Sequence, residues 1–366
     1  MTDLARRLAR QIAATGPITL ADYMAACLLD PEHGYYTTRP PFGAAGDFTT
    51  APEISQMFGE MLALCLAQCW IDRGRPAPAV LAELGPGRGT LMADMLRTLA
   101  AVPGAREALA VHMVEAAPAL RARQAETVAP ARATWHDHVA ALPEAPLFLV
   151  ANEFLDALPI RQFRRAGDGW QEVMVGLDPA GRLAPGLLPA APVAALAHRL
   201  ADIQDGAVVE LCPALPGIVA EVAGRIARHG GAALIIDYGG WAGTGDTFQA
   251  VRAHAPADPF AAPGAADLTA HVDFAAIATA ARAAGAEASA MSPQGLFLER
   301  LGITARAEAL ARRLTGAARD NHVAAHRRLT HPDGMGELFK VIAIHPPGTP
   351  PPPGLDPLGA PRGPAA

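Results

Sequence analysis

The chain has 366 residues, 51% of them hydrophobic, so it can bury a large core, and one or two domains are expected. Thirty Lys and Arg residues against 36 Asp and Glu give a formal net charge of −6. This balance argues against a general nucleic-acid-binding protein, because such proteins carry a basic face. The four cysteines form no C-x-x-C pair, so we expect buried free thiols, a reducing compartment and no metal site.

The first third of the chain predicts helices and one long loop. Leu4, Leu8 and Ile12 recur at helical spacing, and Thr19 precedes a second helix that ends near Leu29. A Gly-, Pro- and aromatic-rich loop over 30–52 leads to a helix over 54–71. That helix is shorter than the roughly 20 apolar residues a membrane span needs, so we expect no span. We assign 1–75 to N-terminal helices and a lid loop.

Strands and helices then alternate. The expected strands and helices are 79–84, 90–100, 110–114, 117–127, a short segment at 131–135, 147–151, 216–229, 233–236, 273–284, 286–291 and 337–345. This order predicts a mostly parallel sheet with helices on both faces. An insertion over about 160–209 predicts a hairpin, a helix near 191–203 and a strand at 207–211. We assign 76–345 to the core and 346–366 to a disordered Pro- and Gly-rich tail.

Three glycines at alternate positions follow the first strand of this alternation. Gly85, Gly87 and Gly89 come directly after Glu83 and before a helix. Glycines allow a tight turn and a close approach of the backbone to a ligand, and the helix N-terminus offers free N–H groups. The dinucleotide fingerprint is G-x-G-x-x-G, so the G-x-G-x-G spacing with an acid in front favours S-adenosylmethionine over NAD.

Polar residues also follow the next two strands. Glu115 ends the second strand, where a carboxylate can accept hydrogen bonds from ribose hydroxyls. Trp135 and Asp137 follow the third, where they could contact an adenine ring and its amino group. A helix cap and a surface turn are the alternatives for Glu115 and Asp137. With Asn152, which ends the fourth strand, these residues complete the predicted cofactor set.

The segment after Asn152 predicts the acceptor side of the site. Glu153 and Asp156 are three residues apart, so a helical turn would place both carboxylates on one side. Paired carboxylates suit a cationic acceptor such as a guanidinium. We predict that Glu153 and Asp156, with Asp237 as a third member, are catalytic. An ordinary helix start with favourable acids is the alternative.

Several longer motifs resemble the MidA-like S-adenosylmethionine-dependent methyltransferases, whose eukaryotic members are the mitochondrial complex I assembly methyltransferases. The resemblance covers nearly the whole chain to about residue 345. It is carried by Gly46-Asp47-Phe48-Thr49-Thr50-Ala51-Pro52-Glu53-Ile54-Ser55-Gln56-Met57-Phe58-Gly59-Glu60, Glu83-Leu84-Gly85-Pro86-Gly87, Ala151-Asn152-Glu153-Phe154-Leu155-Asp156-Ala157-Leu158-Pro159, Asp237-Tyr238-Gly239, Asp267-Leu268-Thr269-Ala270-His271-Val272-Asp273-Phe274 and Met335-Gly336-Glu337-Leu338-Phe339-Lys340.

The resemblance implies a class I methyltransferase (Rossmann-like α/β) fold, S-adenosylmethionine as cofactor, and protein arginine methylation. The resemblance also implies that Gly85, Gly87 and Glu115 contact the cofactor. The implied partner is the 49-kDa-type subunit of respiratory complex I, or its bacterial counterpart. The Ala-, Arg- and Pro-rich composition suggests a bacterial cytoplasmic protein, or a mitochondrial matrix protein if the chain is eukaryotic. The alternatives are a non-catalytic assembly chaperone with a vestigial pocket, a small-molecule methyltransferase and a nicotinamide-dependent oxidoreductase.

Overall fold

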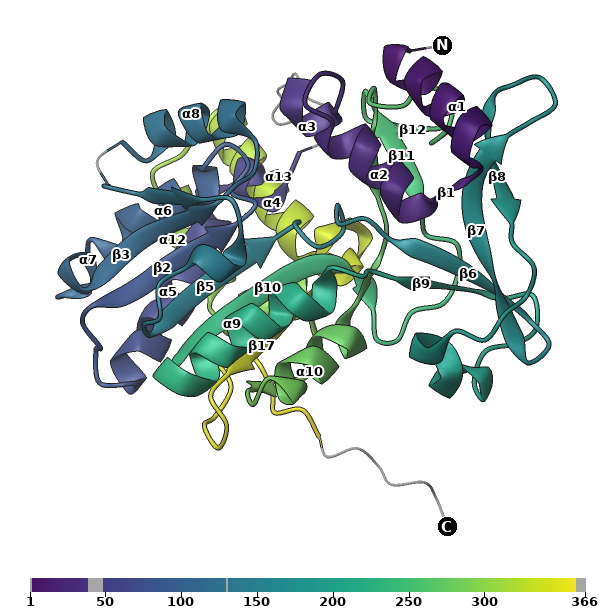
Figure 1. Cartoon of the computed structure of the whole chain (residues 1–366). Helices are drawn as coiled ribbons and strands as arrows, with labels where there is room; N and C mark the ends of the chain where they lie inside the picture. The colour runs from purple at the N-terminus through teal and green to yellow at the C-terminus, as the bar shows by residue number, and fades with distance from the viewer. Residues whose placement is uncertain (1, 39–48, 130, 360–366) are drawn as a thin grey trace. The chain divides into compact units, whose positions relative to one another are not determined.

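The computed structural model describes residues 2–38, 49–129 and 131–359 (Figure 1). The predicted lid loop falls partly on 39–48, and that part lies outside the described residues. The chain divides into two compact units. The core unit comprises 49–155, 216–241 and 273 onward. The second unit comprises the chain up to residue 48, then 156–215 and 242–272.

The core unit is built on a mostly parallel sheet. Its main strands, in spatial order, are β15 (Glu287–Ala288), β17 (Phe339–His345), β10 (Gly231–Gly240), β5 (Leu147–Asn152), β2 (Ala79–Leu84), β3 (Leu109–Val114) and β4 (Thr134–His136). From β10 to β4 every neighbouring pair is parallel, whereas β17 runs antiparallel to β10. The strand order reverses between β2 and β5, and in open α/β sheets ligands bind outside the strand ends at such a point.

Helices flank this sheet on both faces. In Figure 1, α9 (Leu215–His229) and α10 (Phe274–Ala283) lie on the face toward the viewer. The other helices of the unit are α4 (Ala51–Ile54), α5 (Gln56–Asp72), α6 (Thr90–Leu99), α7 (Ala105–Ala108), α8 (Pro118–Thr127), α11 (Gln294–Arg300), α12 (Ile303–Ala311) and α13 (Gly316–Thr330). The predicted mostly parallel α/β sheet with helices on both faces is confirmed. Among the described residues, no helix is long and apolar enough to cross a membrane.

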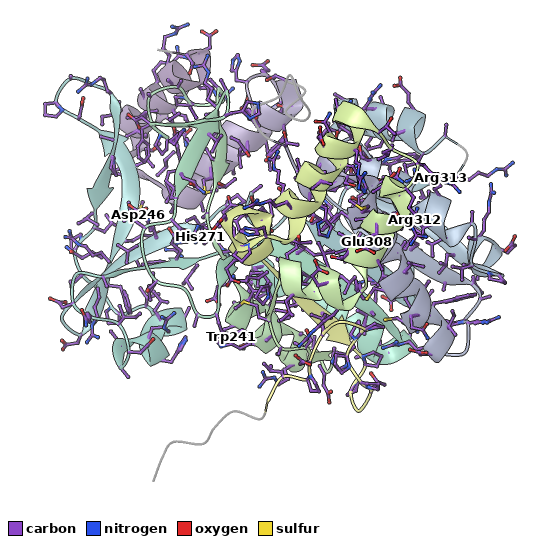
Figure 2. The ribbon with its side chains drawn as sticks, turned by 180° about the vertical axis from the view of Figure 1, so that it is seen from behind. Trp241, Asp246, His271, Glu308, Arg312 and Arg313 are labelled. Atoms are coloured by element: carbon purple, nitrogen blue, oxygen red, sulfur yellow. The ribbon has the colours of Figure 1, made fainter. Side chains whose placement is uncertain are left out.

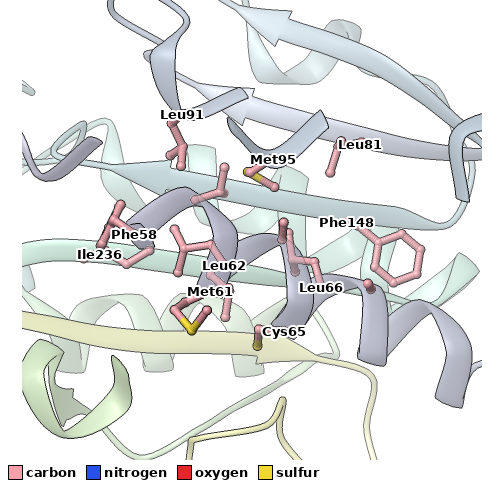
Figure 3. Close-up of a cluster of buried hydrophobic side chains, with 14 of the residues drawn as sticks. Phe58, Met61, Leu62, Cys65, Leu66, Leu81, Leu91, Met95, Phe148 and Ile236 are labelled. Atoms are coloured by element: carbon pink, nitrogen blue, oxygen red, sulfur yellow. The ribbon is translucent and has the colours of Figure 1, made fainter. Parts of the chain in front are cut away.

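Helix α5 shows how sequence pattern becomes core packing. Ser55 caps its N-terminus by accepting a hydrogen bond from the Met57 N–H at 3.2 Å. Figure 3 shows its side chains against strands β2, β5 and β10 and helix α6. Leu62 and Phe58 are fully buried there, and truncating such a leucine to alanine typically costs about 2–5 kcal/mol. The thiols of Cys65 and Cys69 are buried in the same helix, as predicted.

The second unit collects the N-terminal helices and the insertion. Its elements are α1 (Asp3–Thr15), β1 (Ile18–Thr19), α2 (Leu20–Leu29), α3 (Tyr35–Thr38), β6 (Arg161–Ala166), β7 (Gly169–Leu177), β8 (Leu183–Leu187), β9 (Val208–Leu211), β11 (Gln249–Arg252), β12 (Ala255–Ala257) and β13 (Asp267–Thr269). One sheet has the order β1-β7-β6-β9 with β8 on β7, and a second has the order β12-β11-β13. Thr19 caps α2 by accepting from the Asp22 N–H, and residues 178–181 form a turn in which the Gly181 N–H donates to the Asp178 carbonyl at 2.8 Å.

The structure differs from the predicted organisation in four places. Helix α5, which we placed with the N-terminal helices, belongs to the core unit, and residues 1–48 belong with the insertion. The predicted helix at 191–203 is a short 3-10 segment, Ala194–Leu200. The predicted strand at 286–291 is shortened to Glu287–Ala288, followed by an isolated bridge between Ser289 and Pro357. The tail is ordered as far as residue 359, where the Ala290 N–H donates to the Asp356 carbonyl at 2.8 Å.

Candidate active site

The turn between β2 and α6 requires its glycines. Gly85, Gly87 and Gly89 have φ angles of +61°, +53° and +81°, which disfavour any residue with a Cβ. A Cβ at Gly85 would also lie 2.6 Å from a ring carbon of Phe154. The Gly85 N–H donates to the Val114 carbonyl on β3 at 3.0 Å, which fixes the start of the turn. The chain therefore bends sharply just where β2 ends.

Helix α6 begins at this turn without a side-chain cap. Gly89 occupies the cap position and has no side chain to offer the first N–H groups. The Met92 N–H donates to the Glu83 carboxylate instead, which leaves those of Thr90 and Leu91 for a ligand. The Thr90 hydroxyl donates to the Glu53 carboxylate at 2.5 Å, and Arg88 lies 3.5 Å from the same carboxylate. These contacts attach α4 to the glycine turn, and the sequence alone did not single out Glu53.

Glu83 lies near the end of β2, two residues before the glycine turn begins. It is 3% exposed, and burial, with a smaller contribution from the negative charge of Glu115, raises its pKa to about 8. The backbone N–H of Met92 donates to its carboxylate. Within the described residues, the other oxygen, Oε2, is buried without a hydrogen-bond partner. A buried oxygen of this kind at a strand end is a group that a bound ligand can satisfy.

Glu115 and Trp135 are joined by a residue that the sequence analysis missed. Gln124 on α8 is fully buried; its amide nitrogen donates to the Gly87 carbonyl at 2.9 Å and to the Glu115 carboxylate at 3.1 Å. Its amide oxygen accepts from the Trp135 indole N–H at 2.9 Å. The available signal was its i+4 spacing from Leu120, which places a polar side chain on the buried face of α8.

The carboxylate of Glu115 caps the start of α8 and also contacts the buried Gln124. It accepts from the Ala117 N–H at 2.8 Å at the start of α8, and burial raises its pKa. Asp137 is placed differently: its side chain is 72% exposed and paired with Arg121. The structure therefore groups Gly87, Glu115 and Trp135 around the buried Gln124, and leaves Asp137 exposed to solvent.

Glu153 is held in an unusual backbone conformation directly after β5. Its φ is +51°, a rare value for a residue with a side chain, and one that is frequent at functional sites. Its carboxylate accepts from the Ala51 N–H at 3.0 Å and from the Asn152 side-chain amide at 2.9 Å. The Asn152 amide oxygen is buried without a partner among the described residues. These contacts fix one negative charge at the end of the strand.

The predicted pairing of Glu153 with Asp156 on a helical turn is wrong. Residues 153–158 form bends and a turn, because the left-handed Glu153 interrupts any helical path. Asp156 begins the segment that belongs to the second unit, where it is 7% exposed and its carbonyl accepts from the Ala270 N–H at 3.0 Å. The two side chains therefore do not share one helix face.

Asp237 organises the backbone after Glu153. Its fully buried carboxylate accepts from the N–H groups of Phe154 at 3.2 Å and Leu155 at 2.9 Å, and from its own neighbour Tyr238 at 3.0 Å. Three backbone donors to one carboxylate favour a positioning role over the direct catalytic contact that the sequence predicted.

The sheet order, the glycine turn and the polar strand ends together define a class I methyltransferase. Residues 61–292 match the model of a family of S-adenosyl-L-methionine-dependent methyltransferases, and the chain belongs to this family. Curated relatives from Danio rerio and Homo sapiens, both named protein arginine methyltransferase NDUFAF7, mitochondrial, are each 35% identical to the chain. These alignments cover 93% and 94% of the chain, and 86% and 84% of the respective relatives.

A solved structure gives the same result for the fold. A protein from Burkholderia thailandensis, crystallised with S-adenosylhomocysteine, is 35% identical to the chain and superposes with a TM-score of 0.81. The match covers 93% of this chain and 91% of that one. A second, native crystal structure of a Burkholderia thailandensis protein superposes with a TM-score of 0.77 at 34% identity.

The chain is thus an S-adenosylmethionine-dependent methyltransferase, and its own residues fit that cofactor. Two buried oxygens without partners, Glu83 Oε2 and Asn152 Oδ1, end neighbouring strands beside the glycine turn. A cationic sulfonium and amino group suit such acceptors, and the uncapped start of α6 suits the carboxylate of the same ligand.

Proposed function

We propose that the chain methylates arginine side chains of a protein. The observation that carries the proposal is Glu153, whose carboxylate is fixed by Ala51 and Asn152 at the carboxyl end of β5, beside the glycine turn. The names of the curated relatives, protein arginine methyltransferases, support the same acceptor. A fixed negative charge at this place suits a cationic acceptor.

The chemistry requires such a charge. Bound S-adenosylmethionine supplies a methyl group on a positively charged sulfur, and a guanidinium is also positive, so the two groups repel. A fixed carboxylate offsets this repulsion without having to reorganise during the reaction. Arginine has a planar fork of N–H donors that a carboxylate oxygen can accept in a defined orientation.

Each neighbouring residue then has a separate task. Asn152 and the Ala51 N–H orient the Glu153 carboxylate, and Asp237 fixes the backbone that follows it. Glu83, Gly85, Gly87, Gly89, Glu115, Trp135 and Asn152 form the wall that holds the cofactor. Asp137 could reach the adenine amino group only by leaving Arg121, so it is the least supported member of the predicted set. Asp156 is a proposed acceptor-side residue.

The proposed acceptor protein is the 49-kDa-type subunit of respiratory complex I, or its bacterial counterpart. This choice rests on the motif resemblance described above. It places the reaction in the bacterial cytoplasm, or in the mitochondrial matrix for a eukaryotic chain, and it makes the inserted segment 160–209 a candidate for recognising a protein acceptor.

The test is transfer of a labelled methyl group to that subunit by wild type, Glu153→Gln and Glu107→Gln. Glutamine keeps an oxygen for the Ala51 N–H but removes the charge, so we expect transfer to fall by at least about a hundredfold. The exposed Glu107 on α7 is the matched control and should leave transfer unchanged. Equal rates for wild type and Glu153→Gln would remove Glu153 from the reaction.

A further inference from the structure

Behind the candidate site, the core unit contains a groove that the proposed reaction does not use. It has a volume of about 530 Å³, within the range of ligand-binding pockets. It lies among α4, the start of α5, α12 and α13. Its lining residues are Ile54, Ser55, Gln56, Leu310, Arg313, Leu314, Ala318, Asn321, His322 and Ala325.

One wall of the groove is continuous with the candidate site. Ser55 and Ile54 line the groove, and the adjacent Glu53 accepts the hydrogen bond from Thr90 at the glycine turn. Two residues before Glu53, the Ala51 N–H donates to Glu153. A ligand in the groove would therefore contact the same short segment that orients the catalytic carboxylate.

The opposite wall carries one arginine, Arg313, and belongs to a helical segment that is strongly basic in a chain that is acidic as a whole. Between residues 303 and 330 there are six arginines but only two carboxylates, Glu308 and Asp320. Arg306 pairs with Glu60 through two hydrogen bonds. Within the described residues, the other five arginines form no ion pair with a carboxylate: Arg312, Arg313, Arg319, Arg327 and Arg328. Figure 2 shows Arg312 and Arg313 side by side at the end of α12.

The lining combines this charge with apolar and amide groups. Leu310, Leu314 and Ile54 offer an apolar floor, whereas Arg313 offers a charged fork. Gln56 and Asn321 carry amides that can bond a peptide backbone. Arginine clusters beside apolar surface are how proteins commonly recognise acidic peptide motifs.

We propose that this groove binds an acidic segment of the methylated protein, with an apolar side chain of that segment in contact with Leu310 and Leu314. That the bound segment belongs to the methylated protein rests on the proposed function. That the segment is acidic and carries an apolar side chain rests on the groove alone. Docking there would hold the acceptor while its arginine is modified, which lowers KM for a protein acceptor without altering the chemical step.

The first experiment measures binding directly. The probe is a fluorescein-labelled decapeptide of alternating Glu and Leu, titrated with the full chain and followed by anisotropy; a Lys-Leu decapeptide and a ten-nucleotide single strand serve as comparators. We expect the Glu-Leu peptide to bind, and Arg313→Glu or Ala318→Trp to weaken it by about tenfold or more. Arg312→Glu, which has the same charge change on a residue outside the lining, should change it by less than about threefold.

The outcomes separate the groove from the proposed function. No binding of the Glu-Leu peptide, equal effects of Arg312→Glu and Arg313→Glu, or tighter binding of the oligonucleotide would each overturn the groove assignment. Calorimetry with S-adenosylhomocysteine should give wild-type affinity in every variant, which shows that the core unit is folded. With the 49-kDa-type subunit as acceptor, Arg313→Glu should raise KM and leave kcat unchanged. Peptide binding without any methyl transfer by wild type would overturn the proposed function alone.

Discussion

The carboxylate of Asp237 accepts the backbone N–H of Leu155 at 2.9 Å, and this contact links β10 to the segment that follows Glu153. The same carboxylate oxygen also accepts from Phe154, so one side chain fixes two successive peptide groups. The left-handed Glu153 needs such support, since its conformation is unfavourable for a residue with a Cβ.

Asp237→Asn should therefore destabilise the core unit. The amide would present a donor to backbone donors in a site with no access to water, and we expect a loss of about 2–4 kcal/mol in the free energy of unfolding. Urea unfolding of wild type and variant checks this, with the exposed Asp320→Asn as control. A change of less than about 0.5 kcal/mol would contradict the positioning role.

Gly85→Ala should lower the free energy of unfolding by more than its positive φ angle alone would. Its Cβ would meet the Phe154 ring at 2.6 Å in addition to the strain of φ +61°. Gly167 has a φ of +60° with nothing within 4 Å, so Gly167→Ala measures the strain by itself, at about 1–2 kcal/mol.

Thermal unfolding and calorimetry with S-adenosylhomocysteine should give a larger loss of stability for Gly85→Ala than for Gly167→Ala. Only Gly85→Ala should lose affinity for the ligand. Identical behaviour of the two variants would show that the close approach between Gly85 and Phe154 is not required.

Glu83 should make the stability of the ligand-free protein fall as the pH rises. Burial raises its folded-state pKa to about 8, above the ordinary pKa of a glutamate, so the folded state favours the protonated form. The stabilising effect is complete below the unfolded-state pKa, near 4.5, and is lost as the pH rises through about 8.

Urea unfolding at several pH values should show this loss in wild type, and a flatter profile in Glu83→Gln, which cannot ionise. Parallel profiles for the two proteins across that range would mean that Glu83 does not titrate as the structure indicates.

Gln124→Leu should weaken cofactor binding without unfolding the protein. Leucine fills a similar volume but cannot connect Gly87, Glu115 and Trp135, so the pocket wall loses its internal hydrogen bonds. We expect about a 10- to 100-fold loss of affinity for S-adenosylhomocysteine, by analogy with second-layer contacts around other ligands. Gln68→Leu, on an exposed position of α5, is the control, and equal affinity in both variants would contradict the role given to Gln124.

The sequence predicted the fold well where pattern and local chemistry agree. The strand at 79–84, the glycine turn and the helix at 90–100 follow from an apolar run, three glycines and helical periodicity, all of which act within a few residues. Helices α11 and α12 were not predicted, because they are short and the packing of α12 against α5 joins distant parts of the chain.

The site was predictable in composition but not in geometry. Glu83, Gly85, Gly87 and Glu115 lie where the strand ends placed them. The conformation of Glu153 and the buried position of Asp237 depend on backbone donors contributed by other segments, which no local pattern reveals. Gln124 was missed because its i+4 spacing from Leu120 indicates a buried position but does not reveal its partners Gly87, Glu115 and Trp135.

The most direct test is mass spectrometry of the 49-kDa-type subunit after incubation with S-adenosylmethionine and either wild type or Glu153→Gln. The account predicts methylarginine on that subunit with wild type, and at least about a hundredfold less with Glu153→Gln although S-adenosylhomocysteine still binds. Methyl transfer confined to a small molecule or to another residue type, or no transfer by a wild-type protein that binds the cofactor, would contradict it.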